Sequence, residues 1–271
     1  MRMMRNVTLI ASFVALLTGA TSAQEPEVAA AKELRRLPAE EAHQGVASDL
    51  HFVYAIADSK IGKYDKATGK RVAQFEGDPL VFIHMNSCSV IAQELVCALS
   101  NFPHLPQISS IEWFSTSTLK HLRSHSFGIT PGSITWADWH DGAWWICYAN
   151  YDGKGGDPSR NHNSTLLVKY SPQFVEQGAW AFPEKVLERF GHMSASGGRW
   201  GRGNLLYVTG HDLAEMYALR LPRAGARLEL VKTFALPTNG QAFDWEDAEK
   251  GLLWTIERGK TELVESQLPP K

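Results

Sequence analysis

The side chains best suited to proton transfer in this sequence are those that stand at the ends of apolar stretches. His211 and Asp212 follow the apolar stretch Leu205–Thr209, and Glu257 follows a second one, Leu252–Ile256. An imidazole titrates near neutral pH, and a positioned imidazole or carboxylate can transfer a proton in catalysis. The sequence therefore predicts His211 and Glu257 as candidate catalytic residues.

Other polar side chains at similar positions are suited to bind a small polar molecule or the end of a peptide. These candidate ligand-binding residues are Gln44, His84, Asn86, Asn101, Asn150, Tyr151, Ser196, Asp212, Gln241 and Arg258. A divalent metal such as calcium or zinc is an alternative, because imidazole, amide and carboxylate groups bind such ions. Its ligands would come from Asn101, Asn150, His211 and Asp212. Their spacing is not diagnostic, so no metal site is assigned.

These positions belong to a unit that the sequence repeats. Five similar polar stretches are His43–Ala47, His84–Cys88, Gly132–Trp136, Ala195–Arg199 and Gly240–Asp244. Each runs through a turn into an apolar strand, and these strands are Phe52–Ala57, Leu95–Leu99, Trp144–Ala149, Leu205–Thr209 and Leu252–Ile256. Units of about 40 residues, with short strands separated by turns, are typical of the four-stranded blades of a β-propeller.

The fifth unit lacks its fourth strand, and the other end of the chain supplies a replacement. Lys32–Leu37 precedes the first unit much as Glu229–Leu236 precedes the fifth. We therefore predict an all-β fold, a five-bladed β-propeller of four-stranded blades, closed by pairing of Lys32–Leu37 with Thr261–Ser266. An open β-sandwich is the alternative, but it gives no reason for the two ends to complement each other.

The propeller fold would bring the candidate site residues together. The loop that enters the first strand of a blade and the loop that leaves the second strand open on the same face, beside the central channel. We call this end of the channel the channel mouth. Adjacent side chains on an extended chain point to opposite sides, so either His211 or Asp212 would face the channel and the other would support the loop. Polar residues at such a mouth can also serve only to hold water.

The N-terminal segment predicts export. Arg2 and Arg5 precede a short apolar run, Val7–Leu17, and the small residues Thr21–Ala23 follow it. This pattern is typical of a signal peptide over residues 1–23, which leaves residues 24–271 as one propeller domain. A retained membrane anchor is the alternative, although the run is shorter than the roughly 20 apolar residues of a membrane span.

Composition limits the partners of this domain. The 271-residue chain has a formal net charge of −2, and no cluster of basic residues stands out. A nucleic-acid partner is therefore not expected. No long apolar segment follows the predicted signal peptide, so we expect a secreted or periplasmic protein without a membrane span, and a monomer.

The three cysteines are too few to build a disulfide scaffold. Cys88 and Cys97 flank a predicted hairpin turn at Ile91–Glu94, and an oxidising compartment would permit a bridge between them. A change of register by one residue would forbid that bridge, so two buried thiols are the expectation.

Parts of the first and last units resemble the plant- and bacterial-type glutaminyl cyclases, also called glutamine cyclotransferases. The residues that carry the resemblance are Gln44–Ala47, Val53–Tyr54, Ile61–Lys70, Asn239–Asp244, Leu253–Thr255 and Glu262–Glu265. The resemblance implies a five-bladed propeller that cyclises an N-terminal glutamine at the channel mouth, with Gln44 at a site position. The chain also resembles the wider group of exported lactonase- and cycloisomerase-like propellers.

Two site positions of the cyclase family differ in this sequence. The acidic residue that the family carries in the second strand of its first blade would fall at Ala55, which has no proton to transfer. The family's lysine near the end of the last blade would fall near Arg258, whose guanidinium stays protonated. Our first hypothesis is therefore an exported propeller that binds a small polar molecule or a peptide end. A metal-assisted lactonase- or cyclase-type enzyme is the second, and a protein-binding scaffold is the third.

Overall fold

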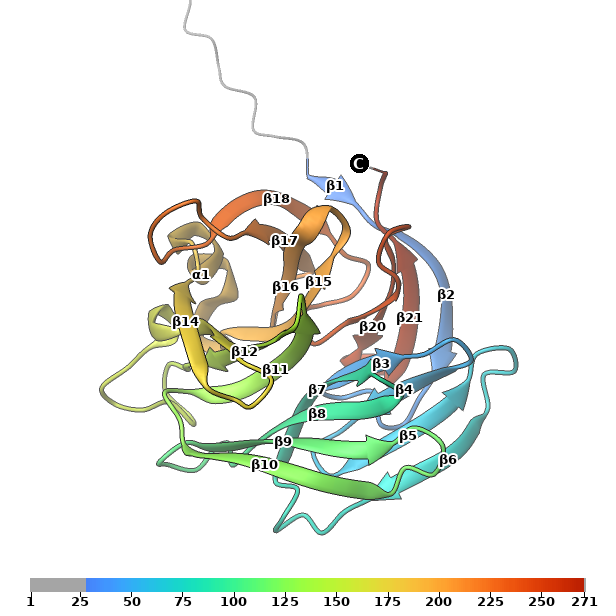
Figure 1. Cartoon of the computed structure of the whole chain (residues 1–271). Coiled ribbons are helices and arrows are strands. Elements are labelled where there is room, and N and C mark those ends of the chain that lie inside the picture. The colour runs from blue at the N-terminus through green and yellow to red at the C-terminus, as the bar shows by residue number, and fades with distance from the viewer. Residues whose placement is uncertain (1–27, 271) are drawn as a thin grey trace, which may run out of the picture.

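The chain folds into a ring of five sheets, and each sheet contains a blade of four antiparallel strands (Figure 1). The computed structural model describes residues 28–270, so the predicted signal peptide lies outside the described residues. Within each blade the strands follow one another from the channel outward. The innermost strands of neighbouring blades touch around the whole ring. The predicted five-bladed β-propeller is confirmed.

The strand boundaries follow the predicted repeat closely. Blade 1 contains β3 (Gly45–Ser48), β4 (Phe52–Ile56), β5 (Lys60–Asp65) and β6 (Arg71–Glu76), and blade 2 contains β7 (His84–Ile91), β8 (Glu94–Ser100), β9 (Ile108–Ser115) and β10 (His121–Ile129). Blade 3 contains β11 (Ser133–His140), β12 (Ala143–Ala149), β13 (Leu166–Tyr170) and β14 (Glu176–Ala181), and blade 4 contains β15 (Ala195–Gly201), β16 (Leu205–Gly210), β17 (Glu215–Arg220) and β18 (Glu229–Ala235). Blade 5 contains β19 (Asp244–Asp247), β20 (Leu252–Glu257), β21 (Glu262–Gln267) and β2 (Lys32–Pro38).

The helical segments are short, and they lie in the connections. They are α1 (Glu184–Phe190), η1 (His162–Ser164), η2 (Gly191–Met193), η3 (Arg202–Asn204) and η4 (Arg258–Lys260). None of the helices within residues 28–270 has the length and apolar character that crossing a membrane requires.

The hydrophobic core is divided into five clusters, one in each wedge between neighbouring blades. The second strand of a blade is covered on both faces, and every residue of β12 is buried. The fourth strand lies at the rim, and most residues of β10 are exposed. Burial therefore follows the distance of a strand from the channel, which explains why the second strands were the clearest apolar runs in the sequence.

The N-terminal strand closes the ring as predicted. β2 pairs antiparallel with β21, from Lys32 opposite Gln267 to Pro38 opposite Glu262. Across this pair the Arg35 Nε donates to Glu265 at 2.5 Å, and the Arg36 Nη1 donates to Glu262 at 2.8 Å. Blade 5 is thus assembled from both ends of the described chain.

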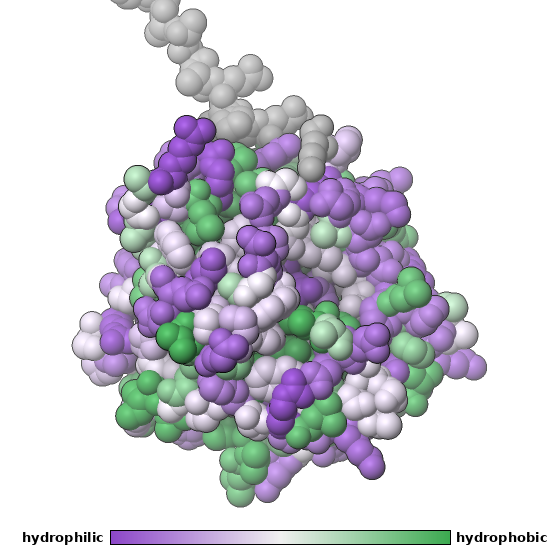
Figure 2. All heavy atoms as spheres, viewed as in Figure 1, coloured by the Kyte–Doolittle hydropathy of each residue, from purple (hydrophilic) through white to green (hydrophobic). Residues whose placement is uncertain are grey.

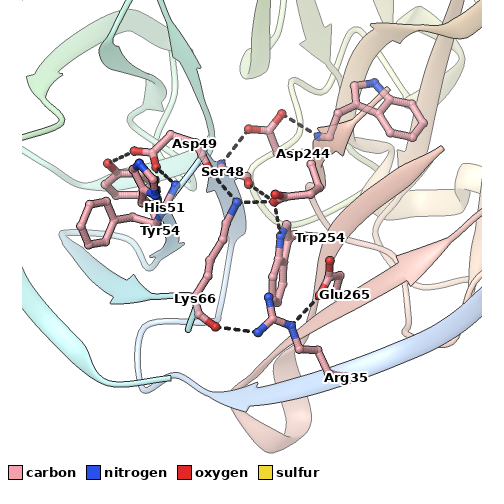
Figure 3. A network of polar contacts seen from close by, with 12 residues as sticks. Arg35, Ser48, Asp49, His51, Tyr54, Lys66, Asp244, Trp254 and Glu265 are labelled. Atoms are coloured by element: carbon pink, nitrogen blue, oxygen red, sulfur yellow. Dashed lines mark hydrogen bonds and ion pairs between the residues drawn. The ribbon is translucent and has the colours of Figure 1, made fainter. Parts of the chain in front are cut away.

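Polar contacts join blade 5 to blade 1 on the side of the ring opposite the channel mouth (Figure 3). The Glu246 carboxylate accepts hydrogen bonds from Lys66, from the Ser48 hydroxyl at 2.8 Å and from the Trp254 indole at 2.8 Å. Arg35 reaches from β2 to the Lys66 carbonyl at 2.6 Å. One carboxylate therefore links three strands across the seam where the ring closes.

A second polar network runs between the innermost strands of blades 3, 4 and 5. The Arg199 side chain, 14 % exposed, contacts Asp138 at 2.8 Å and Asp244 at 2.9 Å. Asp138 also accepts the backbone N–H of Trp200, and Asp244 accepts that of Ser48. Burial raises the pKa of Asp244 to about 6, although the charge of Arg199 acts in the opposite direction. Arg199 thus compensates two buried carboxylates that tie blades together.

Two features of the fold differ from the expectations. Cys88 and Cys97 form a disulfide, so the expectation of two buried thiols is wrong. The reason is the register, because the two-residue turn at Ala92 and Gln93, both with positive φ, places the cysteines directly opposite each other. The second feature is β1 (Ala29–Ala30), which pairs in parallel with β18 and adds a short fifth strand to blade 4.

Candidate functional site

A small pocket lies at the channel mouth, where first strands begin and second strands end. Its lining residues are Gln44, His84, Asn86, Phe102, Thr135, Tyr151, Met193, Ala195, Ser196, His211, Gln241 and Arg258. They come from all five blades, and the cavity volume is about 70 Å³. The propeller brings together residues that are more than 200 positions apart in the sequence, such as Gln44 and Arg258.

Eight of the predicted site residues line this pocket. They are Gln44, His84, Asn86, Tyr151, Ser196, His211, Gln241 and Arg258. Gln44, Asn86, Ser196 and Gln241 are each less than a tenth exposed, so their polar groups form the floor and walls. Burial also raises the pKa of Tyr151, which therefore remains a neutral phenol at physiological pH.

Asn101, Asn150, Asp212 and Glu257 do not line the pocket. The Asn101 side chain holds its own loop, because it donates to the Pro106 carbonyl and accepts the Ile108 N–H, both at 2.9 Å. The buried Asn150 amide donates to the carbonyls of Pro131 and Ser164. The four residues considered as metal ligands are therefore not gathered in one place. No group of three or more His, Cys, Asp or Glu residues within 28–270 is arranged to hold a metal.

His211 is held on both ring nitrogens. Its Nδ1 is 2.6 Å from the Asp212 carboxylate, and the Arg258 Nη1 lies 3.2 Å from its Nε2. A carboxylate only accepts and a guanidinium only donates, so the proton is on Nδ1 and Nε2 accepts from Arg258. Asp212 thus orients the ring although the two residues are adjacent. As long as Arg258 stays in place, His211 has no free nitrogen for a ligand.

His84 has a different environment. Its Nδ1 is 2.7 Å from Asp58, and the Gln44 amide donates to the same carboxylate oxygen at 2.9 Å. No hydrogen bond to the His84 Nε2 is found within residues 28–270. Because Asp58 accepts at Nδ1, the neutral ring presents the lone pair of Nε2. The arrangement matches the carboxylate–histidine pair that orients a general base.

The charge of Asp58 is stabilised at this site. Burial raises the pKa of Asp58, but the hydrogen bonds from His84 and Gln44 and the charge of Arg258 outweigh burial and lower it overall. The carboxylate therefore stays ionised and fixes the His84 ring. His84, which the sequence suggested only as a ligand-binding residue, is better placed for proton transfer than His211.

The sequence analysis did not identify Phe102, which forms an apolar part of the pocket wall beside His84. Phe102 packs against the rings of His84 and Tyr151, with centroids 5.0 and 5.1 Å apart. Gly155 has a φ of +75°, and a Cβ at this position would lie 2.2 Å from the Phe102 ring, so the turn requires glycine here. The signal in the sequence was the position of Phe102 just after the second strand of blade 2, where other blades carry polar site residues.

Comparisons with known proteins support the fold but give no family. Neither a protein-family model nor a curated protein matches the sequence. Among solved structures, the chain is similar to a luciferin-regenerating enzyme at 9 % identity and a TM-score of 0.51, covering 89 % of this chain and 95 % of that one. It is also similar to a PQQ-bound aldose sugar dehydrogenase from Streptomyces coelicolor, at 10 % identity and a TM-score of 0.54, covering 91 % and 83 %. At this identity the likeness concerns the propeller fold alone.

Proposed function

We propose that the channel mouth binds the anionic end of a small polar molecule, such as a carboxylate or the C-terminus of a peptide. The observation that carries this proposal is the state of Arg258. Its guanidinium lines the pocket, donates one hydrogen bond to a neutral imidazole and has no ion pair within residues 28–270. A guanidinium has five N–H donors in a planar fork that matches a carboxylate, so Arg258 has donors to spare for a ligand.

The size and polarity of the pocket limit the ligand further. A cavity of about 70 Å³ accommodates only a few non-hydrogen atoms, so one end of the ligand enters while the rest lies across the mouth. The amides of Gln44, Asn86 and Gln241 offer both donors and acceptors to that end. The Phe102 ring supplies an apolar surface beside them.

N-acetylalanine and its uncharged amide provide the probe pair for this proposal. We expect the native protein to bind the acid at least about tenfold more tightly than the amide, because hydrogen bonds to a charged group are worth about 1.5–3 kcal/mol. Arg258→Gln should abolish this preference, whereas Lys260→Gln, a change in the same short helix but outside the pocket, should keep it. Calorimetric or NMR titration measures both. Equal binding of acid and amide by the native protein would contradict the proposal.

The geometry of His84 favours a second candidate function, the hydrolysis of a small ester or lactone. The His84 Nε2 would take a proton from water as the water oxygen bonds to the carbonyl carbon. The ring C–O bond then breaks, and the alkoxide leaving group receives the proton. Arg258 would stabilise the negative charge that develops on the carbonyl oxygen and then bind the carboxylate of the product. Under this second candidate function the protein is an enzyme whose active site is the same channel mouth. No metal ion is assigned to the step.

Dihydrocoumarin, a neutral lactone, tests this candidate. If His84 is the general base, His84→Gln should lower kcat/KM by about 10²–10⁴-fold, the usual contribution of a positioned base. His211→Gln serves as the comparison and should have a much smaller effect, because Arg258 already occupies its Nε2. A native protein that hydrolyses the lactone no faster than buffer would eliminate this candidate for that substrate class.

We also propose that the protein is exported to an oxidising compartment. The disulfide between Cys88 and Cys97 supports this, because disulfides persist in secreted and periplasmic proteins and are rare in the cytosol. The remaining cysteine, Cys147, is buried, and burial raises its pKa to about 12. It therefore stays a protonated thiol and takes no part in the chemistry proposed above.

A further inference from the structure

A second cavity lies away from the channel mouth, in the wedge between blades 1 and 2. Its volume is about 560 Å³, which is in the usual range for small-molecule sites. Alternate residues of β9 face the same side as Phe114, a member of the cluster between these two blades. Two of them, Ser110 and Glu112, are polar, and both line the cavity. On the other side of the sheet, the neighbouring positions Ile111 and Trp113 are apolar and pack in the next cluster. The polar residues on this side therefore leave part of the wedge unfilled.

The acidic group that lines this cavity is the Glu112 carboxylate, which is only 4 % exposed. It accepts hydrogen bonds from the Ser110 hydroxyl at 2.5 Å, from the His121 Nε2 at 2.7 Å and from the Ser124 hydroxyl. No lysine or arginine within residues 28–270 forms an ion pair with it. A buried carboxylate without a permanent cation is costly, and a cationic ligand would offset that cost.

A further observation points to a ligand at the same place. The cavity is bordered by apolar side chains that face solvent, Val81 at 61 % and Ile108 at 43 % exposure. Figure 2 shows apolar surface along the lower edge of the view, where blade 2 lies. A polar floor and an apolar rim together suit a molecule with a charged end and an apolar body.

We infer that this interblade cavity binds a small organic amine. The ammonium group would donate to the Glu112 carboxylate, and the apolar body would lie against Val81 and Ile108. The cavity would discriminate an amine from an alcohol of the same shape, because only the amine supplies a positive charge to Glu112. This site is separate from the channel mouth, with which it shares no lining residue.

Hexylamine and hexanol are suitable probes, because they share an apolar body and differ in charge. We expect the native protein to bind hexylamine about tenfold or more tightly than hexanol in an NMR titration, with the largest shifts at residues that line the cavity. Glu112→Gln keeps the shape of the side chain and should remove the preference for the amine. Ser126→Trp fills the cavity from its exposed edge and should weaken both probes about tenfold or more.

Three outcomes would overturn the inference. They are equal binding of the two probes, an amine preference that survives in Glu112→Gln, and shifts from hexylamine that move to the channel mouth. Melting curves of both variants check that they are folded. If Glu112→Gln does not fold, Ser126→Trp still tests whether hexylamine binds in this cavity, because Ser126 lies on the exposed strand β10 and forms no hydrogen bond to Glu112; unchanged binding of hexylamine by this variant would overturn the inference.

Discussion

Replacing Arg199 with methionine is expected to lower the free energy of unfolding by about 3–5 kcal/mol, because it leaves two buried carboxylates without their shared cation. Asp138 and Asp244 are 4 % and 1 % exposed, so water cannot replace the guanidinium. Denaturant or thermal unfolding measures the loss. Arg223→Met is the matched control. Arg223 is exposed and forms no ion pair within residues 28–270, so this change should cost no more than about 0.5 kcal/mol.

The effect of Arg199→Met should also depend on pH. Burial already raises the pKa of Asp244, and loss of the positive charge of Arg199 will raise it further. The folded state then holds this proton more tightly than the unfolded state does, so stability falls as the pH rises through the folded pKa. The variant should therefore lose more stability at pH 8 than at pH 5. A loss below about 1 kcal/mol at both pH values would show that Arg199 does not hold the blades together.

Removal of the closing strand is the second change with a large expected effect. A protein that lacks residues 24–40 loses β2, and with it the pairing to β21 and the contacts of Arg35 and Arg36 with Glu265 and Glu262. Blade 5 then has three strands and an exposed edge beside an open seam. We expect no cooperative unfolding transition by calorimetry, because β21 loses its partner strand and the wedge cluster between blades 5 and 1 loses Leu37 and Ala39.

A shorter deletion provides the control for this experiment. A protein that lacks residues 24–30 loses β1, which contributes only two paired residues, and should melt within a few degrees of the native protein. A synthetic peptide spanning residues 28–42 should restore cooperative unfolding to the longer deletion, because it supplies the missing strand. If the two deletions melt alike, the ring does not depend on β2 for closure.

The architecture could be predicted because the same pattern of strands and turns occurs five times in the sequence. Each unit repeats a buried second strand, and the apolar runs at Leu95–Leu99 and Leu252–Ile256 mark that strand directly. The closing strand is predicted from the same repeat, because the last unit lacks a fourth strand and Lys32–Leu37 can supply it. The short strand β1 escaped detection because two residues in parallel pairing carry no periodicity.

The candidate site was only partly predictable. Their positions in the repeat place Gln44, Asn86 and Gln241 at the channel mouth. Those positions do not indicate which hydrogen-bond partner each side chain has. The choice between His84 and His211 depends on whether Arg258 reaches the second ring nitrogen, which is a contact between blades. The Arg199 network does have a signal in the sequence. A charged residue precedes a tryptophan in three successive first strands, at Asp138-Trp139, Arg199-Trp200 and Asp244-Trp245.

The closure of the ring has a consequence for the order of synthesis. The strand that completes the last blade is made long before its partner, since Arg35 and Glu265 are 230 residues apart in the chain. Neither the seam nor blade 5 can form until β21 has emerged. Until then, four blades have an unpaired end, and their apolar wedge faces are exposed. The nascent propeller therefore stays incompletely folded until β21 is made, and pairing of β2 with β21 is a late step of folding.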